Sequence, residues 1–184
     1  MTALVLLLPG GTTAQQKPAN ITSQGIAPLV MNATIKTLPT AVPDLYDEIK
    51  KVEYLEGGEG GDEWLEARYE VYLKGEPMLY FYENEGVINS LQFLSARLKT
   101  SHGLSGKSTA GEIFSSGCKY RIEQWNDGTV YVFCDGLVFV SLEMTENGYK
   151  KQERGYLYGD VTFNKSDFKP SGKAHIVYND RNAN

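Results

Sequence analysis

Cys118 and Cys134 are the two cysteines of the chain, and thiols can support three kinds of chemistry. They can close a disulfide, act as reactive nucleophiles, or bind a metal together with other ligands. A metal site would need further His or Cys at ligand spacing, and the two histidines, His102 and His175, stand alone in the sequence. If the chain matures outside the cytosol, where disulfides persist, the pair predicts a disulfide.

The residues between the cysteines also predict how they could meet. Asn126-Asp127-Gly128 separates two strand-like runs, and these turn residues accept positive φ. If the hairpin closes through this three-residue loop, Cys134 faces Tyr120 across the ladder and Cys118 is its diagonal neighbour. A diagonal pair is somewhat far apart for a bond, so a bulge or a small change of register is needed.

A glycine-lysine segment nearby could be read as part of a nucleotide site. Gly106-Lys107-Ser108-Thr109 resembles the end of a phosphate-binding P-loop, but Ser101 stands where the full pattern requires its first glycine. A chain outside the cytosol also meets little ATP. Thr109 and Glu112, three residues apart, instead predict the capping box of a short helix.

Other catalytic patterns are incomplete. The many acids of residues 53–63 lie among glycines, so no rigid pair of carboxylates for glycoside cleavage is expected, and the spacing of a calcium loop is missing. No Gly-x-Ser-x-Gly elbow activates Ser108 or Ser115. We therefore predict a protein that is not an enzyme, with no catalytic residues, no cofactor and no metal.

Two sets of residues could bind a partner. Ser116-Gly117-Cys118-Lys119-Tyr120 resembles the Ser-Gly-x-x-Tyr motif of the membrane-bound and periplasmic C-type lysozyme inhibitors. That resemblance implies that Ser116 and Tyr120 hydrogen-bond the catalytic carboxylates of lysozyme, with Lys119 as an available cation. The chain departs from those inhibitors in its greater length, its cysteine spacing and the absence of their second motif. The alternative is a glycine at a helix end, leading into a strand whose Tyr120 packs inward.

The second set is a surplus of tyrosines at period two, of which Tyr72, Tyr80, Tyr82 and Tyr131 are the candidates for a groove that binds a sugar or a peptide. Tyrosine offers stacking area and a hydroxyl at a low cost in entropy. Ordinary packing in strands explains the same spacing and is favoured.

The elements that must position these residues follow from periodicity and turn chemistry. We expect an α+β fold, predominantly antiparallel β meanders and hairpins with two short helices. The helices are expected at residues 43–51 and 109–114, and a solvated loop at 53–63. Strands are expected at residues 68–74, 78–82, 87–94, 119–125, 130–134, 137–144, 155–163 and 174–178. A helix followed by three strands occurs twice in this order, so we consider a pseudo-duplicated unit.

The start of the chain predicts export. Residues 1–14 read as a signal peptide that ends in small residues, although no Lys or Arg precedes the apolar run. That run is far shorter than the about 20 residues of a transmembrane helix. No Cys follows it directly, so no lipid attachment is expected. We predict a flexible linker at 15–20, a single α+β domain at 21–178 and a disordered tail at 179–184.

Charge limits the partners. With 18 basic and 23 acidic residues, the chain has no basic excess that would bind nucleic acid or anionic lipid. A nucleic acid is therefore not expected as a partner, and the short apolar run predicts no transmembrane segment.

A family resemblance covers residues 24–144. The run Gly103-Leu-Ser-Gly-Lys-Ser-Thr-Ala-Gly-Glu-Ile-Phe114, then Cys118, a polar hairpin and Cys134-Asp135-Gly136, is similar to the sigma-E-regulated lipoprotein family of bacterial envelope proteins. Segments 23–26 and 70–75 follow the same order upstream. The resemblance implies a periplasm-facing α+β domain with one disulfide, in a family without an established activity. We predict a periplasmic or secreted, non-catalytic binding or structural module whose partner is an envelope protein or a glycan, with lysozyme as one candidate.

Overall fold

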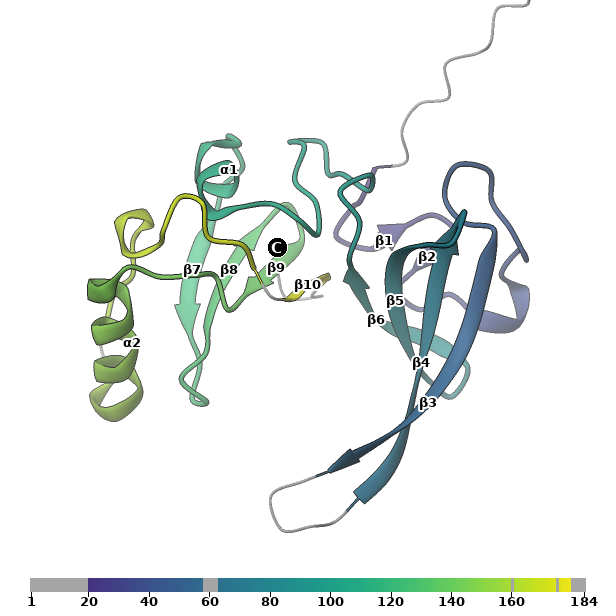
Figure 1. The fold of residues 1–184 in the computed structure, drawn as a ribbon, viewed down its shortest axis with the longest axis horizontal. Helices are drawn as coiled ribbons and strands as arrows, with labels where there is room; N and C mark the ends of the chain where they lie inside the picture. The colour runs from purple at the N-terminus through teal and green to yellow at the C-terminus, as the bar shows by residue number, and fades with distance from the viewer. Residues whose placement is uncertain (1–19, 58–62, 160, 175, 180–184) are drawn as a thin grey trace, which may run out of the picture.

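The computed structural model describes residues 20–57, 63–159, 161–174 and 176–179. Within these residues, eight strands form one antiparallel sheet in the order β3-β4-β5-β6-β10-β9-β8-β7, and β1 and β2 pair separately. Figure 1 shows β3 to β6 on one side and β7 to β9 with both α-helices on the other, with β10 between them. The predicted α+β class with antiparallel meanders is therefore confirmed.

The first half of the large sheet is a meander with tight turns. Lys74-Gly75 and Glu85-Gly86 both adopt positive φ at two successive residues, which suits the twist of a two-residue hairpin. The strands are β3 (Glu48–Gly57), β4 (Glu63–Leu73), β5 (Glu76–Asn84) and β6 (Val87–Phe93), and the short strands β1 (Gly25–Ile26) and β2 (Leu29–Val30) and the 3-10 helix η1 (Ile35–Thr37) precede them.

The second half begins with the predicted helix. The Thr109 hydroxyl accepts from the backbone N–H of Glu112, and the Glu112 carboxylate accepts from the N–H of Thr109, so the expected capping box is confirmed. The elements are α1 (Ala110–Ser115), β7 (Arg121–Gln124), β8 (Val130–Cys134), β9 (Leu137–Val140), α2 (Glu146–Tyr158), the 3-10 helix η2 (Lys165–Asp167) and β10 (Ile176–Asn179).

Strand β10 joins the two halves. It pairs with β9 at four positions, and it pairs with β6 through Tyr178 and Gln92. The sheet is thus continuous from β3 to β7, although its two meanders are each local in sequence.

The main core lies on one face of this sheet. Phe81, Leu91, Phe93 and Phe139 are fully buried there, and Leu29 from β2 packs into the same cluster. Side chains alternate between faces along a strand. A second, smaller cluster of Tyr131, Phe133, Val138 and Val140 accordingly occupies the other face, so that β8 and β9 are buried on both sides.

The helix predicted at residues 43–51 is wrong. Residues 42–46 form a turn in which Asp44 has a positive φ, and β3 begins at Glu48. The N–H of Asp47 donates to the carbonyl of Tyr72, and β3 pairs with β4 along its whole length. A long partner strand therefore overrides the local helix signal. The first copy of the pseudo-duplicated unit has no such helix, so the repeat is not formed as expected.

The strand predicted at residues 155–163 is also wrong, because residues 146–158 form α2. The Thr145 hydroxyl caps this helix by accepting from the N–H of Gly148, and Gly159 with positive φ ends it. The loop predicted at 53–63 is wrong at both of its ends, because residues 53–57 belong to β3 and β4 begins at Glu63. Residues 58–62 lie outside the described residues.

The predictions for the two ends of the chain mostly concern residues outside the described ranges. This applies to the signal peptide at 1–14, to linker residues 15–19, to tail residues 180–184 and to His175. At the inner boundaries, Asn20 forms a bridge with Lys99, and Asn179 is the last residue of β10. In the part of the chain that the structure describes, no helix combines the length and the apolar character needed to cross a bilayer.

Candidate functional site

A cleft of about 780 Å³ lies where the two halves of the chain meet. Residues 20–23 and 100–102 line it from the first half, and residues 119–121, Phe133 and 135–136 line it from the second half. Gly136 has a positive φ, and a Cβ placed there would collide with Ser23, so the two sides approach each other very closely at this glycine. The cleft therefore depends on a glycine that no larger residue can replace without strain.

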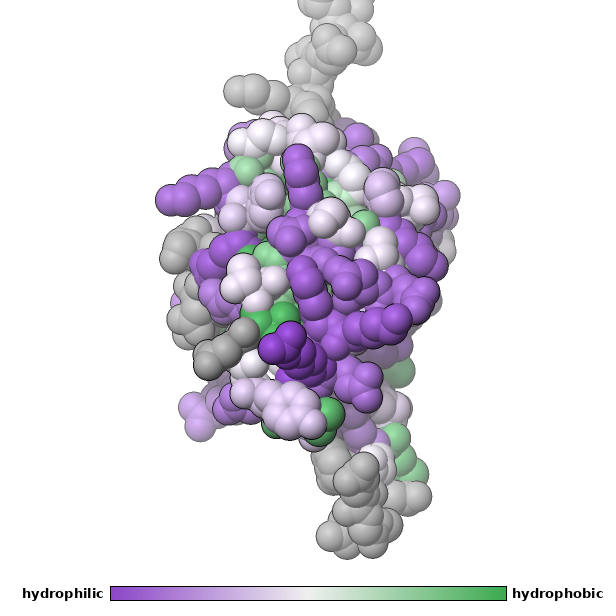
Figure 2. All heavy atoms as spheres, turned by 90° about the vertical axis from the view of Figure 1, so that its left-hand side faces the viewer, coloured by the Kyte–Doolittle hydropathy of each residue, from purple (hydrophilic) through white to green (hydrophobic). Residues whose placement is uncertain are grey.

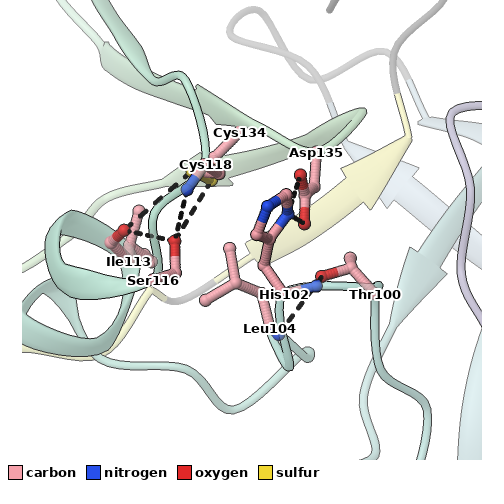
Figure 3. Close-up of polar contacts among 8 residues, drawn as sticks. All are labelled: Thr100, His102, Leu104, Ile113, Ser116, Cys118, Cys134 and Asp135. Carbon is pink, nitrogen blue, oxygen red and sulfur yellow. Dashed lines mark hydrogen bonds and ion pairs between the residues drawn. A yellow bond between two sulfur atoms is a disulfide. The ribbon is translucent and has the colours of Figure 1, made fainter.

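A histidine–carboxylate pair lines the cleft. His102 Nδ1 lies 2.7 and 2.8 Å from the two carboxylate oxygens of Asp135, as Figure 3 shows. Because a carboxylate accepts hydrogen bonds, Nδ1 is the donor, and the structure describes no partner for Nε2. The Asp135 side chain is 13% exposed and that of His102 is 42% exposed, so the imidazole borders the open cleft.

Both members of this pair are held by local structure. Asp135 has a positive φ in the two-residue turn between β8 and β9. His102 sits in a loop that Thr100 closes, because the Thr100 hydroxyl accepts from the N–H groups of His102 and Leu104. The side chains therefore meet although they are far apart in sequence.

Lys119 and Tyr120 border the same cleft. Tyr120 is 38% exposed, and its ring packs edge-on against Phe114 of α1 with the centroids 4.9 Å apart. The exposed Lys119 forms no ion pair with the described residues. Next to them, the Arg121 guanidinium lies 3.9 Å from the centroid of the buried Phe133 ring, and its Nε donates to Glu123 over 2.8 Å. The alternative prediction that Tyr120 packs inward therefore holds only in part, because its ring contacts Phe114 and remains partly exposed.

The disulfide fixes this edge of the cleft. Cys118 and Cys134 are bonded, with their Cα atoms 6.0 Å apart. In the antiparallel ladder, Arg121 pairs with Phe133. One step further along, this register places position 120 opposite position 134, as predicted. The bond forms because β7 begins only at Arg121, so Cys118 lies outside the ladder, after the positive φ of Gly117. It holds Lys119 and Tyr120 beside the turn that carries Asp135.

Ser116, the third residue of the predicted partner-binding motif, is engaged elsewhere. Its hydroxyl donates to the carbonyl of Ile113 over 2.8 Å and accepts from the N–H of Cys118 over 3.2 Å (Figure 3). It therefore closes the end of α1, and it does not line the cleft. Of the three predicted residues, Lys119 and Tyr120 lie together in the cleft, and the Ser116 hydroxyl caps the end of α1.

Three of the four candidate groove tyrosines share one face of the sheet. Tyr72, Tyr80 and Tyr82 lie on β4 and β5, and the register places Tyr54 of β3 on the same face. Arg68 lies between two rings of this group, 4.1 Å from the centroid of Tyr80 and 5.5 Å from that of Tyr54. We call these residues, with Glu70, the tyrosine cluster.

Glu70 accepts the hydrogen bonds of the donors around it in the tyrosine cluster. It is 8% exposed, and its carboxylate accepts from Arg68 Nε and Nη2 over 2.9 and 2.7 Å and from the Tyr72 hydroxyl. The hydrogen bond from Tyr72, together with the Arg68 guanidinium, outweighs burial and holds the pKa of Glu70 below its usual range. Burial, with Tyr82 nearby, raises the pKa of Tyr54 to about 12.

Tyr131 does not join this cluster. It is buried on β8, and its ring centroid lies 4.3 Å from that of Trp125. Its hydroxyl donates to Asp127 over 3.3 Å, and burial together with that carboxylate raises the pKa of Tyr131. The predicted groove of four tyrosines is therefore not assembled, because strand packing separates Tyr131 from the others.

The pairing of His102 with Asp135 was missed from sequence. His102 stands alone among neighbouring residues, and its partner follows 33 positions later. The available signal was Asp135-Gly136, an aspartate at the tip of a tight turn next to the disulfide. Among the described residues, no group of three or more His, Cys, Asp or Glu side chains is placed to hold a metal ion.

The fold and the cleft define an α+β protein in which a disulfide fixes one edge of the cleft. No family model matches the chain, and no curated protein matches it. Among solved structures, it is similar to that of the uncharacterized protein yfeY from Escherichia coli, with 11% sequence identity and a TM-score of 0.47. The match covers 88% of this chain and 99% of the other. At this level the likeness carries no functional argument.

Proposed function

We propose that this chain is a non-catalytic binding module that works outside the cytosol, and that the cleft around His102, Lys119 and Tyr120 is its ligand site. The disulfide supports the compartment, because such bonds persist in oxidising environments. The apolar, small-residue start of the sequence and its resemblance to a bacterial envelope family point the same way.

One observation carries the choice of site. Several polar groups border the cleft without a described hydrogen-bond partner, namely Lys119 Nζ, the Tyr120 hydroxyl and His102 Nε2. Their backbone is nevertheless fixed by the disulfide, the Thr100 loop and the β8–β9 turn. A backbone that is fixed in advance lowers the cost of ordering these polar groups around a ligand.

The arrangement around His102 favours binding over catalysis. Its ring is hydrogen-bonded to Asp135, and no serine, threonine or cysteine among the described residues has a hydrogen bond to it. A nucleophile in hydrogen-bond reach of the imidazole is the usual sign of covalent catalysis.

The lysozyme inhibitor is the second candidate, and the exposed Tyr120 beside Lys119 favours it. Its motif also needs the serine hydroxyl, whereas that of Ser116 is spent on Ile113 and Cys118. We therefore rank it below a ligand in the cleft. The tyrosine groove ranks lower still, because Arg68 already lies against the Tyr80 ring and Glu70 already accepts from the Tyr72 hydroxyl.

Affinity capture tests the proposal. The immobilised oxidised protein is exposed to a bacterial envelope extract, to sonicated peptidoglycan and to lysozyme. We expect a retained component that is lost with the double variant Lys119→Glu/Tyr120→Ala. The matched control Lys36→Glu/Tyr158→Ala changes the same residue types at exposed positions outside the cleft and should retain it.

The outcomes separate the candidates. Retention of lysozyme alone would favour the lysozyme-inhibitor candidate over a ligand from the envelope. Retention that both double variants leave unchanged would place binding elsewhere and reject the cleft as the ligand site. A circular-dichroism spectrum identical to that of the native chain is required of each variant before its result is used.

A further inference from the structure

The polar lining of the cleft identifies a class of ligand. Asn20, Ser23 and Ser101 line it with side chains for which the structure describes no hydrogen bond. Amides and hydroxyls of this kind both donate and accept, which matches the alternating demands of sugar hydroxyls. Across the cleft lie Tyr120 and Lys119, which has no ion pair among the described residues, and His102 Nε2 borders the same space.

From this combination we infer that the cleft binds an acidic glycan, a sugar chain that carries a carboxylate. The inference rests on the proposed function and deepens it by naming the ligand. The sugar hydroxyls contact Asn20, Ser23 and Ser101, and the carboxylate contacts Lys119.

The charges in the cleft place the carboxylate at Lys119. Arg121 shares its guanidinium with Glu123 and the Phe133 ring, and Asp135 is bridged by His102, so both are already engaged. Lys119 is the cation of the cleft without an ion pair among the described residues. Because the chain has a formal net charge of −5, an anionic ligand is attracted only where a local cation outweighs the surrounding field.

Tyr120 supplies the flat surface against which a sugar ring packs. Its ring is held edge-on by Phe114, 4.9 Å away, and still has 38% of the residue exposed. A rigid aromatic side chain offers contact area with little loss of entropy on binding. An acidic peptide would also satisfy Lys119, but it would leave the hydroxyl-rich side of the cleft poorly matched.

Calorimetric titration with defined probes tests the inference. The probes are the galacturonic acid trimer and the N-acetylglucosamine–N-acetylmuramic acid disaccharide, each compared with a form whose carboxylates are converted to amides. We expect at least one acidic probe to bind about tenfold more tightly than its amide, and to weaken as ionic strength rises.

Matched variants locate the contact. Lys119→Gln and Tyr120→Ala are each expected to weaken the acidic probe about tenfold, because each removes one anchor of the site. Lys36→Gln and Tyr158→Ala should leave its affinity unchanged. Triglutamate serves as the peptide probe and is expected to bind more weakly than the sugar.

Three results would overturn the inference. The protein could bind the acid and amide forms of both sugars equally, or bind triglutamate more tightly than the acidic sugars. The third result is an affinity for the acidic sugar that neither Lys119→Gln nor Tyr120→Ala changes. If the envelope capture still depends on Lys119 and Tyr120 while these titrations fail, the acidic glycan is rejected and the cleft stands as a ligand site. If capture fails too, the proposed function is rejected with it.

Discussion

The cleft and the tyrosine cluster both combine tyrosine with charged side chains, and they differ in which polar groups they leave without a described partner. In the tyrosine cluster, Arg68 donates to Glu70, and the Tyr72 hydroxyl donates to the same carboxylate. In the cleft, Lys119 and the Tyr120 hydroxyl have no described partner. The comparison teaches that aromatic and charged residues on a surface do not by themselves mark a binding site. The residues that the fold has not already paired are the better guide.

The two regions also differ in how they are held. Ladder hydrogen bonds on both sides of β4 fix the tyrosine cluster. The cleft lies at the ends of strands and in loops, so it depends on the disulfide, a helix cap and two turns. Loops on a rigid scaffold commonly carry function for this reason.

Removing the disulfide is expected to produce the largest effect. The bond joins positions 16 residues apart, so the Cys118→Ala/Cys134→Ala variant should lose about 3 kcal/mol of unfolding free energy in the chain-entropy account. Urea denaturation measures this loss, and reduced native protein should match the variant. Stability equal to that of the oxidised protein would show that the cleft is held without the bond.

Breaking the tyrosine cluster should come next. Arg68→Ala removes the cation that donates to the buried Glu70 carboxylate, and we expect a loss of about 2 kcal/mol with ligand binding in the cleft unchanged. Arg97→Ala is the control, because Arg97 and Glu76 form an exposed pair and should contribute less than about 0.5 kcal/mol. A ligand whose affinity falls with Arg68→Ala alone would move the site to this face.

A smaller effect, with a pH signature, is expected where η2 meets α2. The Asp167 side chain is 1% exposed; burial opposes its ionisation, but hydrogen bonds from Lys151, the Asn164 backbone and Asn147 outweigh it and lower its pKa. A lowered folded-state pKa stabilises the fold above the unfolded-state pKa of about 3.9, and this contribution is lost as pH falls through the folded value.

Asp167→Asn should therefore cost about 1 kcal/mol at neutral pH, and its stability should fall less steeply than that of the native chain below about pH 4. Thermal unfolding across pH 2–7 measures both. Glu143→Gln, which removes an exposed pair with Lys169, is the control and should keep the native pH profile. If the stability of the native protein and that of Asp167→Asn fell in parallel below about pH 4, ionised Asp167 would not stabilise the fold as described.

The smallest stability effect belongs to the cleft itself. Lys119→Gln breaks no described contact, so its free energy of unfolding should change by less than about 0.5 kcal/mol while acidic ligands weaken. Chemical denaturation of this variant sharpens the contrast with Arg68→Ala. A loss above 1 kcal/mol would make Lys119 a structural residue, like those of the tyrosine cluster.

Turn chemistry made the second meander predictable from sequence. Asn126-Asp127-Gly128 accepts the backbone of a tight hairpin loop, and Thr109 with Glu112 can satisfy the first N–H groups of a helix. These signals act over a few residues, so tertiary contacts do not easily override them. The Gly117 conformation that frees Cys118 from the ladder has no comparably specific signal.

Helix α2 was missed because it has no apolar face. Gly148 is its buried residue, and Figure 2, which looks onto this side, shows a mainly hydrophilic surface. The helix is held by Lys151 on Asp167 and by the Gln124 amide, which donates to the carbonyl of Gln152. Side chains at Gly148 or Gly155 would collide with Asp167 or Gln124. Hydrophobic periodicity cannot detect a helix that packs through glycines and hydrogen bonds.

Half of the candidate site could be predicted. Lys119 and Tyr120 were found through a local motif beside a cysteine. His102 was missed because its partner Asp135 is brought to it only by the packing of the Thr100 loop against the β8–β9 turn. Contacts between distant loops are a property of the assembled chain and leave no periodic pattern in either segment.

The position of β10 bears on the order in which this chain can fold. Both meanders pair strands that follow one another in sequence, but the strand that unites them is made after all the others. Until Ile176–Asn179 emerges from the ribosome, β6 and β9 present open edges to which a strand of another molecule can add. Nascent chains that stall shortly before this segment would therefore be prone to aggregate, although most of their contacts could already have formed.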